Sequence, residues 1–112
     1  MDVTPRIEPG QNIIKSYGNG RITAGQQTYK YPVFITPDQV WENVTLEKGS
    51  NLLQSCDIII IAGEKPFDAE DFMAFQSFDT NVEIMTLDAA ARTFNALLAE
   101  GRRVGLYIVK QK

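Results

Sequence analysis

The sequence predicts an α/β fold of three layers, in which a mixed central sheet contains two βα units and an N-terminal antiparallel β meander. Three observations support this prediction. The run Ile58–Ala62 holds four consecutive isoleucines, which cannot alternate between core and solvent, so it predicts a strand buried on both faces. The run Val104–Val109 is also apolar on both faces. Between them, residues 86–101 carry the apolar spacing of a helix that covers a sheet.

The first third of the chain predicts the meander. Residues 13–17 form its first strand, and the Asn-Gly pair within residues 18–20 favours the positive φ angles of a tight hairpin turn. Residues 21–23 return along the first strand. After a second turn, residues 28–36 mix β-branched and aromatic residues and form the third strand. Pro32 lacks an amide hydrogen and therefore predicts an edge or a bulge within that strand.

The middle of the chain predicts connections and the first βα unit. Residues 38–48 carry the only tryptophan and predict a connection, as a short strand or a turn, and residues 49–55 predict a short helix. After the isoleucine strand, Asp68 is a good helix N-cap. The helix that follows carries three aromatic residues at helical spacing, which favour core packing over a cofactor site: Phe72, Phe75 and Phe78.

The second βα unit begins with a short strand at residues 82–85. Thr86 is the predicted N-cap of the next helix, and Gly101 stands where a left-handed residue ends a helix. Right-handed crossovers place helices on at least one face, so we expect layers of extra β structure, central sheet and helices. The residues expected to face the sheet are Leu87, Ala90, Ala91, Phe94, Leu97 and Leu98.

Composition favours one globular domain across residues 1–112, with residues 1–11 as a loose tail. The chain is 44% hydrophobic and 22% charged, which is typical of a folded domain. A net charge of -3 and the lack of a basic stripe argue against nucleic acid and anionic membrane surfaces as partners. The longest apolar run is too short to cross a bilayer, so we expect no stable membrane insertion. No signal or transit pattern is visible, which predicts a cytoplasmic protein.

The inventory of reactive residues favours a non-enzymatic protein. Histidine is absent, which removes the commonest general base. The single cysteine, Cys56, can form no internal disulfide and has no histidine to activate its thiol. Because carboxylates at ligand spacing are also missing, we expect neither a metal site nor a cofactor.

Residues 83–104 carry a specific pattern: Glu-Ile-Met, then two alanines, Arg-Thr-Phe-Asn, a leucine and Glu-Gly-Arg-Arg-Val. This stretch resembles the signature of the MTH-nine-three-eight-like domain family, which includes the third mitochondrial NADH-dehydrogenase assembly factor. Thr86-Leu87 replaces the Asp-Thr pair of that signature, and Ala91 replaces its cysteine. The resemblance implies a three-layer fold with a mixed central sheet, and most members of the family have no assigned activity.

Two functional hypotheses follow. The first is a binding or assembly-factor-like module that contacts a protein partner or a second copy of itself. The second is a small-anion-binding enzyme or sensor that uses the crevice where the strands ending at Gly63 and Met85 meet. The residues expected in this crevice are Gly63, Lys65, Thr86, Arg92 and Asn95, with Lys65 and Arg92 supplying charge. The competing interpretation, which we favour, is that Arg92 and Asn95 bond to the backbone and hold the helix in place.

Three further residues form a weaker candidate patch for a partner. Arg102 and Arg103 follow the second helix and are expected at the opposite edge of the sheet from the crevice. Pairing with the helix dipole is the simpler explanation for them. Trp41 is either an exposed anchor for a partner or a cap on the edge of the core.

Overall fold

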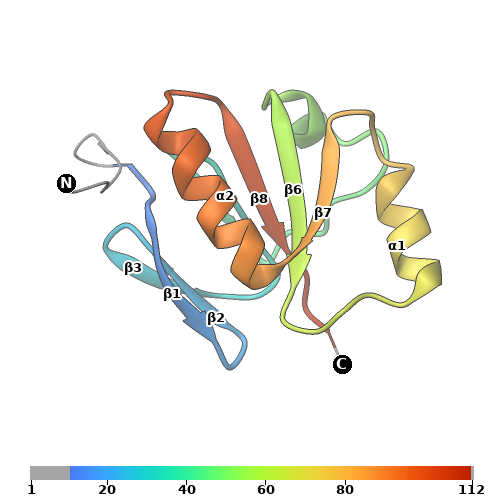
Figure 1. The fold of residues 1–112 in the computed structure, drawn as a ribbon, viewed down its shortest axis with the longest axis horizontal. Helices are drawn as coiled ribbons and strands as arrows, with labels where there is room; N and C mark the ends of the chain where they lie inside the picture. The colour runs from blue at the N-terminus through green and yellow to red at the C-terminus, as the bar shows by residue number, and fades with distance from the viewer. Residues whose placement is uncertain (1–10, 112) are drawn as a thin grey trace.

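The computed structural model describes residues 11–111, and it confirms the predicted mixed α/β fold. The predicted tail at residues 1–11 lies outside the described residues except for Gln11. In chain order (Figure 1) the elements are β1 (Ile14–Gly18), β2 (Arg21–Ala24), β3 (Gln27–Lys30), β4 (Val33–Ile35), β5 (Val40–Glu42), the 3-10 helix η1 (Asn51–Gln54), β6 (Ile58–Gly63), α1 (Ala69–Gln76), β7 (Val82–Thr86), α2 (Leu87–Ala99) and β8 (Val104–Ile108).

The described strands form two sheets. The meander β1-β2-β3 is antiparallel, and the larger sheet has the order β5-β4-β8-β6-β7. Strand β6 is parallel to both β7 and β8, whereas β4 is antiparallel to β5 and β8. The two apolar runs of the sequence, which form β6 and β8, therefore lie in the interior of the sheet, as predicted.

The prediction of one strand across residues 28–36 is wrong. Strand β3 ends at Lys30, and β4 begins at Val33 and pairs with β5 and β8 in the larger sheet. Pro32, which follows Tyr31 through a cis peptide bond, lies between the two strands. Because proline has no amide hydrogen to give to a ladder, the chain leaves one sheet here and enters the other.

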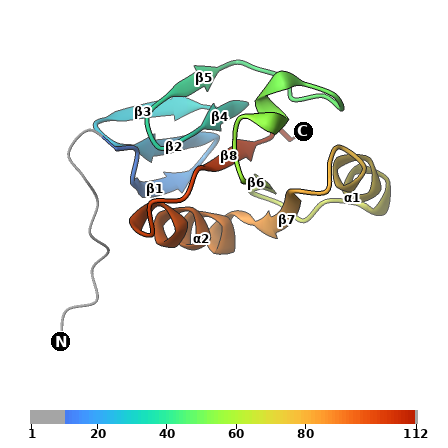
Figure 2. The ribbon, with the colours of Figure 1, turned by 90° about the horizontal axis from the view of Figure 1, so that it is seen from above.

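Helix α2 covers one face of the larger sheet, and α1 lies beside the end strand β7 and packs toward the core on the opposite face (Figure 2). Ile60 and Ala62 of β6 belong to a core shared with α2 and the meander. Ile59 and Ile61 belong to a second core shared with η1 and the aromatic residues around α1. The meander thus shares a layer with α2, which differs from the expected order of layers.

Handedness explains this arrangement. The crossover from β6 through α1 moves one strand outward, to β7. The crossover from β7 through α2 moves back across β6, to β8. Since both crossovers are expected to be right-handed, a reversal of direction places the two helices on opposite faces.

The helix ends confirm the capping predictions. The Asp68 carboxylate accepts a hydrogen bond from the Asp71 amide at 2.8 Å, and the Thr86 hydroxyl accepts one from the Ala89 amide at 3.4 Å. Gly101 follows α2 with a φ of 75°, the left-handed value that ends a helix. No helix within residues 11–111 has both the length and the apolar composition needed to cross a membrane.

The three aromatic residues at helical spacing, two on α1 and Phe78 just after it, are predicted to pack in the core, and one of them does not. Phe75 and Phe78 pack against the second core, with ring centroids 5.6 Å apart. Phe72 is 41% exposed, and the neighbouring Met73 is 70% exposed. The helix buries none of its residues, because it lies beside the end strand β7 and only its inner side reaches the core.

Candidate functional site

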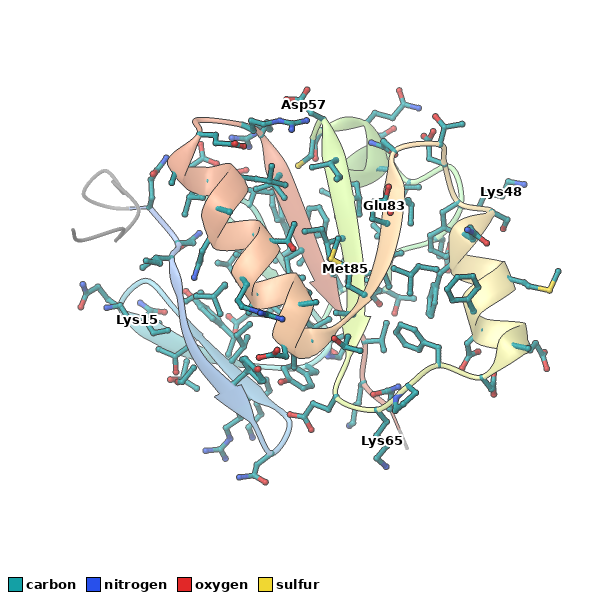
Figure 3. The ribbon with its side chains drawn as sticks, viewed as in Figure 1. Lys15, Lys48, Asp57, Lys65, Glu83 and Met85 are labelled. Atoms are coloured by element: carbon teal, nitrogen blue, oxygen red, sulfur yellow. The ribbon has the colours of Figure 1, made fainter. Side chains whose placement is uncertain are left out.

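Three parallel strands end together at one edge of the larger sheet. Gly63 at the end of β6 pairs with Thr86 at the end of β7, and β8 ends on the other side of β6. Lys65, labelled in Figure 3, lies just beyond this edge. The turn between β1 and β2 meets the same edge, where the Gly20 amide donates a hydrogen bond to Glu64 Oε1 at 3.1 Å. The carboxyl edge of the sheet therefore faces the tip of the meander.

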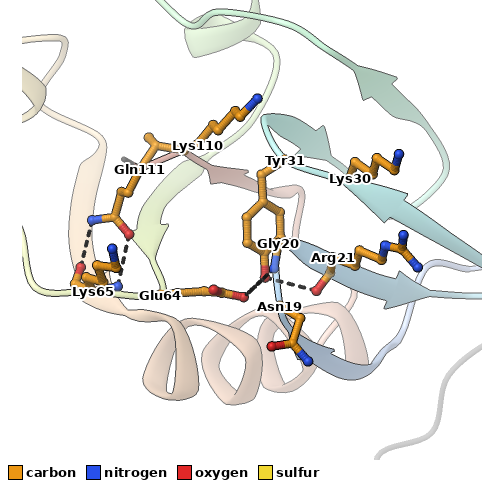
Figure 4. Close-up of a pocket in the computed structure, with 10 residues that line it drawn as sticks. Asn19, Gly20, Arg21, Lys30, Tyr31, Glu64, Lys65, Lys110 and Gln111 are labelled. Carbon is orange, nitrogen blue, oxygen red and sulfur yellow. Dashed lines mark hydrogen bonds between the residues drawn. The ribbon is translucent and has the colours of Figure 1, made fainter.

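A hollow of about 400 Å³ opens between these parts (Figure 4). Four basic side chains and one carboxylate line it among the described residues, although the whole chain is acidic. The residues that line the hollow therefore have a net positive charge, on a protein of negative net charge. Its lining residues are Asn19, Gly20, Arg21, Lys30, Tyr31, Glu64, Lys65, Val109, Lys110 and Gln111.

Two of the basic residues stand directly opposite each other. Arg21 on β2 pairs with Lys30 on β3 in the register of the meander. Figure 4 shows both side chains extending to the same side of the hairpin. Like charges at directly opposed positions repel, which makes this an unfavourable pair in the free protein. An anion bound beside the pair would relieve that repulsion.

The one carboxylate of the hollow has partners within the protein. The Tyr31 hydroxyl lies 2.9 Å from Glu64 Oε1 and 2.9 Å from the carbonyl oxygen of Arg21. Burial, together with the hydrogen bond to Glu64, raises the pKa of Tyr31 well above its ordinary value. Tyr31 therefore stays neutral over the physiological range and joins the meander to the loop after β6.

A side-chain amide closes the other side of the hollow. The Lys65 amide donates to Gln111 Oε1 at 2.9 Å, and Gln111 Nε2 donates to the Lys65 carbonyl oxygen at 2.8 Å. Gly63 makes this possible, because a Cβ at that position would lie 2.6 Å from Gln111 Oε1. The glycine thus provides space for Gln111, which crosses the end of β6.

The structure separates the five residues expected in the crevice. Lys65 lines the hollow, and Gly63 lies under Gln111 beside it. Thr86 caps α2 and borders a neighbouring depression of about 340 Å³. Arg92 and Asn95 line neither of these hollows.

Arg92 and Asn95 both bond within the protein. Arg92 forms an ion pair with Asp88 at 2.9 Å on the exposed face of α2. The Asn95 amide donates to the Ile14 carbonyl oxygen at 2.9 Å and accepts from the Ile14 amide at 2.8 Å. Asn95 therefore joins α2 to β1, which agrees with the structural interpretation of this residue.

Sequence reasoning missed three of the basic residues in the hollow. Arg21 and Lys30 come from the meander, and Lys110 follows the last strand. The positions of Arg21 and Lys30, on either side of the second turn, could have indicated a pair of opposed cations. The approach of the meander to the carboxyl edge of the sheet is a tertiary contact, and no sequence signal indicates it.

The weaker partner patch is divided in the structure. Trp41 is half-buried on β5 and packs against Phe34 with ring centroids 5.5 Å apart. Arg102 and Arg103 lie at the amino end of β8, and Arg103 forms an ion pair with Asp38 at 3.0 Å. Burial works against the charge of Asp38, but the hydrogen bond and charge of Arg103 outweigh it and lower the pKa of the carboxyl.

A second candidate surface lies on α1. Phe72 and Met73 are two of the three most exposed large apolar residues among those described, the third being Tyr17 at 41% exposure. A groove of about 200 Å³ lies between α1 and β7, and Phe72 but not Met73 lines it. Its lining residues are Lys65, Pro66, Phe67, Phe72, Ile84, Met85 and Thr86.

Within residues 11–111, no three histidine, cysteine, aspartate or glutamate residues lie together as a metal site would require. Cys56 is buried before β6, and that burial raises the pKa of its thiol. The thiol therefore remains protonated, which makes it a poor nucleophile.

The fold and these surfaces define a small α/β domain with a five-stranded mixed sheet and an antiparallel meander. The chain belongs to the family of proteins of unknown function DUF498/DUF598, whose model matches residues 14–109. A comparison with curated proteins finds no match.

Two crystal structures share this fold. An outer membrane protein from Bartonella henselae is 22% identical, with 93% of this chain and 98% of that chain covered and a TM-score of 0.60. A protein from Bordetella parapertussis is 23% identical, with 91% and 98% covered and a TM-score of 0.59. At these identities the similarity establishes the fold alone.

Proposed function

We propose that this protein is an MTH-nine-three-eight-like module without enzymatic activity, which acts by binding other proteins as an assembly factor does. The signature at residues 83–104 supports the MTH-nine-three-eight-like assignment, and the exposed apolar pair on α1 supports the binding of other proteins. This pair, Phe72 and Met73, is the single observation on which the proposal depends most.

Phe72 and Met73 are adjacent in the chain and both exposed on α1. Clustered exposed apolar side chains mark interaction sites more often than scattered ones do, and aromatic residues and methionine are enriched at protein interfaces. Phe75 and Phe78 already attach α1 to the second core, so Phe72 and Met73 are not needed for that attachment. Their exposure is therefore best explained by a partner that covers them.

Capture from a native extract tests the proposal. We expect the tagged protein, after mild crosslinking, to recover a partner in stoichiometric amount, and the double variant Phe72→Ser/Met73→Ser to lose it. Tyr17→Ser is the matched control, because Tyr17 has the same exposure as Phe72 and lies on β1. Recovery of no stoichiometric partner, together with a strictly monomeric mass, would overturn the proposal.

The basic hollow supports a second candidate, the binding of a small anion at the carboxyl edge of the sheet. The opposed cations Arg21 and Lys30 carry this alternative, because a phosphate or carboxylate would neutralise their repulsion. Titration with phosphate or citrate, followed by NMR, should shift the amides of residues 19–21, 30–31, 64–65 and 110–111. The shifts should disappear in Arg21→Ser/Lys30→Ser, and their absence in the wild-type protein would end this candidate.

A further inference from the structure

The segment of the chain that contains α1 and β7 carries charged residues of one sign only. Residues 66–86, which comprise α1, β7 and the segments before each of them, contain five acidic residues and no lysine or arginine. The net charge of the whole chain is -3, so the rest of the chain is net positive. We call this stretch the acidic face. The acidic residues are Asp68, Glu70, Asp71, Asp79 and Glu83.

Six of the seven residues that line the apolar groove along β7 also belong to the acidic face, and the seventh is Lys65. Ile84 packs with the core on the α1 side of the sheet, and Met85 packs with the core on the α2 side. The groove therefore follows the outer edge of β7, the last strand of the sheet (Figure 3). Its volume of about 200 Å³ suits anchoring side chains of a segment that lies across the edge.

Acidic residues lie close to exposed or half-buried apolar residues on both α1 and β7. Glu70 precedes Met73 by three residues on α1, so the two side chains share one face of the helix. Glu83 precedes Met85 by two residues on β7, so these two side chains share one face of the sheet. All three acidic residues nearest to Phe72, at positions 68, 70 and 71, are exposed. A segment that covers Phe72 and Met73 would therefore meet exposed carboxylates beside them, whereas the one charged residue in the lining of the groove itself is Lys65.

We propose that the acidic face binds a cationic amphipathic segment of a partner protein. Its apolar side chains would contact Phe72, Met73 and the groove, and its lysine or arginine side chains would pair with the acidic residues. This inference rests on the proposed function, and it adds the chemistry of the partner.

The charge of the face also argues against two other occupants. A second copy placed symmetrically would bring the same acidic residues together across the interface, because a two-fold contact opposes identical surfaces. An anionic membrane would repel the face for the same reason. A cationic segment is the occupant that the acidic face attracts.

Binding of a designed peptide tests the inference. The probe is a fluorescein-labelled helical peptide with leucine along one face and lysine along the other. The comparison probes are a peptide of the same composition in scrambled order and a leucine-glutamate peptide of the same spacing. We expect the amphipathic cationic peptide alone to bind, with affinity that falls as salt rises, and to shift NMR signals of residues 66–86.

Charge variants distinguish binding at the acidic face from a general attraction between the cationic peptide and an acidic protein. Glu70→Gln/Glu83→Gln should weaken peptide binding roughly fivefold, given exposed pairs worth about 0.5 kcal/mol each. Glu42→Gln/Glu47→Gln removes the same charge from exposed positions outside the acidic face and should leave binding unchanged. Met73→Ser should weaken it roughly tenfold through lost apolar contact.

The inference would be overturned by equal binding of the scrambled peptide, by equal loss in both charge variants, or by a concentration-dependent dimer that Met73→Ser abolishes. Association with phosphatidylserine vesicles in place of the peptide would do so too. If the peptide fails while capture from extract still requires Phe72 and Met73, the inference is wrong and the proposed function stands. If capture also fails and the protein is strictly monomeric, both are wrong.

Discussion

Replacing Asn95 with alanine removes the side chain that joins α2 to β1. The Asn95 amide makes two hydrogen bonds with one residue, at 2.8 Å to the amide and 2.9 Å to the carbonyl of Ile14. Ile14 is buried, with 7% exposure, and its backbone faces α2 at this point. In the variant, both backbone groups of Ile14 lose their partner, and water can reach them only in part.

The loss in the free energy of unfolding can be calculated from these contacts. Each neutral hydrogen bond contributes about 1 kcal/mol net, and each buried group without a partner adds part of its desolvation penalty of about 1–3 kcal/mol. We expect Asn95→Ala to lower the free energy of unfolding by about 2–4 kcal/mol. For a domain of this size, that corresponds to a melting temperature lower by about 8–17 °C.

Urea unfolding followed by circular dichroism measures the free energy, and hydrogen exchange at the Ile14 amide reports the lost bond directly. Arg92→Ala is the matched control, because Arg92 lies on the same helix and makes an exposed ion pair worth less than about 0.5 kcal/mol. If Asn95→Ala is no less stable than Arg92→Ala and the Ile14 amide exchanges at its original rate, the structural role of Asn95 is refuted.

Three further predictions concern the core and the titrating groups. Gly105→Ala should destabilise the protein by about 1–3 kcal/mol in urea unfolding, because the new Cβ would lie 2.6 Å from Phe34 Cζ; unchanged stability would contradict it. Tyr31→Phe should lower stability by about 1–2 kcal/mol near neutral pH through its lost hydrogen bonds. Because folding raises the pKa of Tyr31, its contribution to stability is full below about pH 10 and falls as the pH rises further. Above about pH 10, the free energy of unfolding measured in urea should therefore fall less steeply for the variant than for the wild type. The Cys56 thiol should react with Ellman's reagent far more slowly in the folded protein than in urea, since burial raises its pKa; equal rates would contradict the buried position.

Local patterns were sufficient for the elements of the second half of the chain. The isoleucine run of β6 does not alternate between apolar and polar residues, so it is compatible only with a strand buried on both faces. The boundaries of α2 follow from Thr86 and Gly101, which act through backbone groups of their own helix. Phe72 was misassigned because aromatic spacing indicates a helix without indicating how much of it the neighbouring strands cover.

The candidate site was predicted less completely. Lys65 was expected near the carboxyl edge of the sheet because strand order within βα units follows general rules. Arg21 and Lys30 belong to the meander, which packs against this edge, and Asn95 forms hydrogen bonds with Ile14, 81 positions earlier in the chain. Contacts of this kind depend on how separate elements pack, and neither partner of such a contact indicates the other in the sequence.

The sequence by itself determined the two buried strands, the helix caps and the tight Asn-Gly turn, because each depends on residues close together in the chain. Only the tertiary structure decided that the chain changes sheets at Pro32, that the meander shares a layer with α2, and that a basic hollow and an acidic apolar face lie on different parts of the surface. The physical reason is range: hydrophobic periodicity and capping act within a few residues, whereas burial and the grouping of charges are properties of the packed chain.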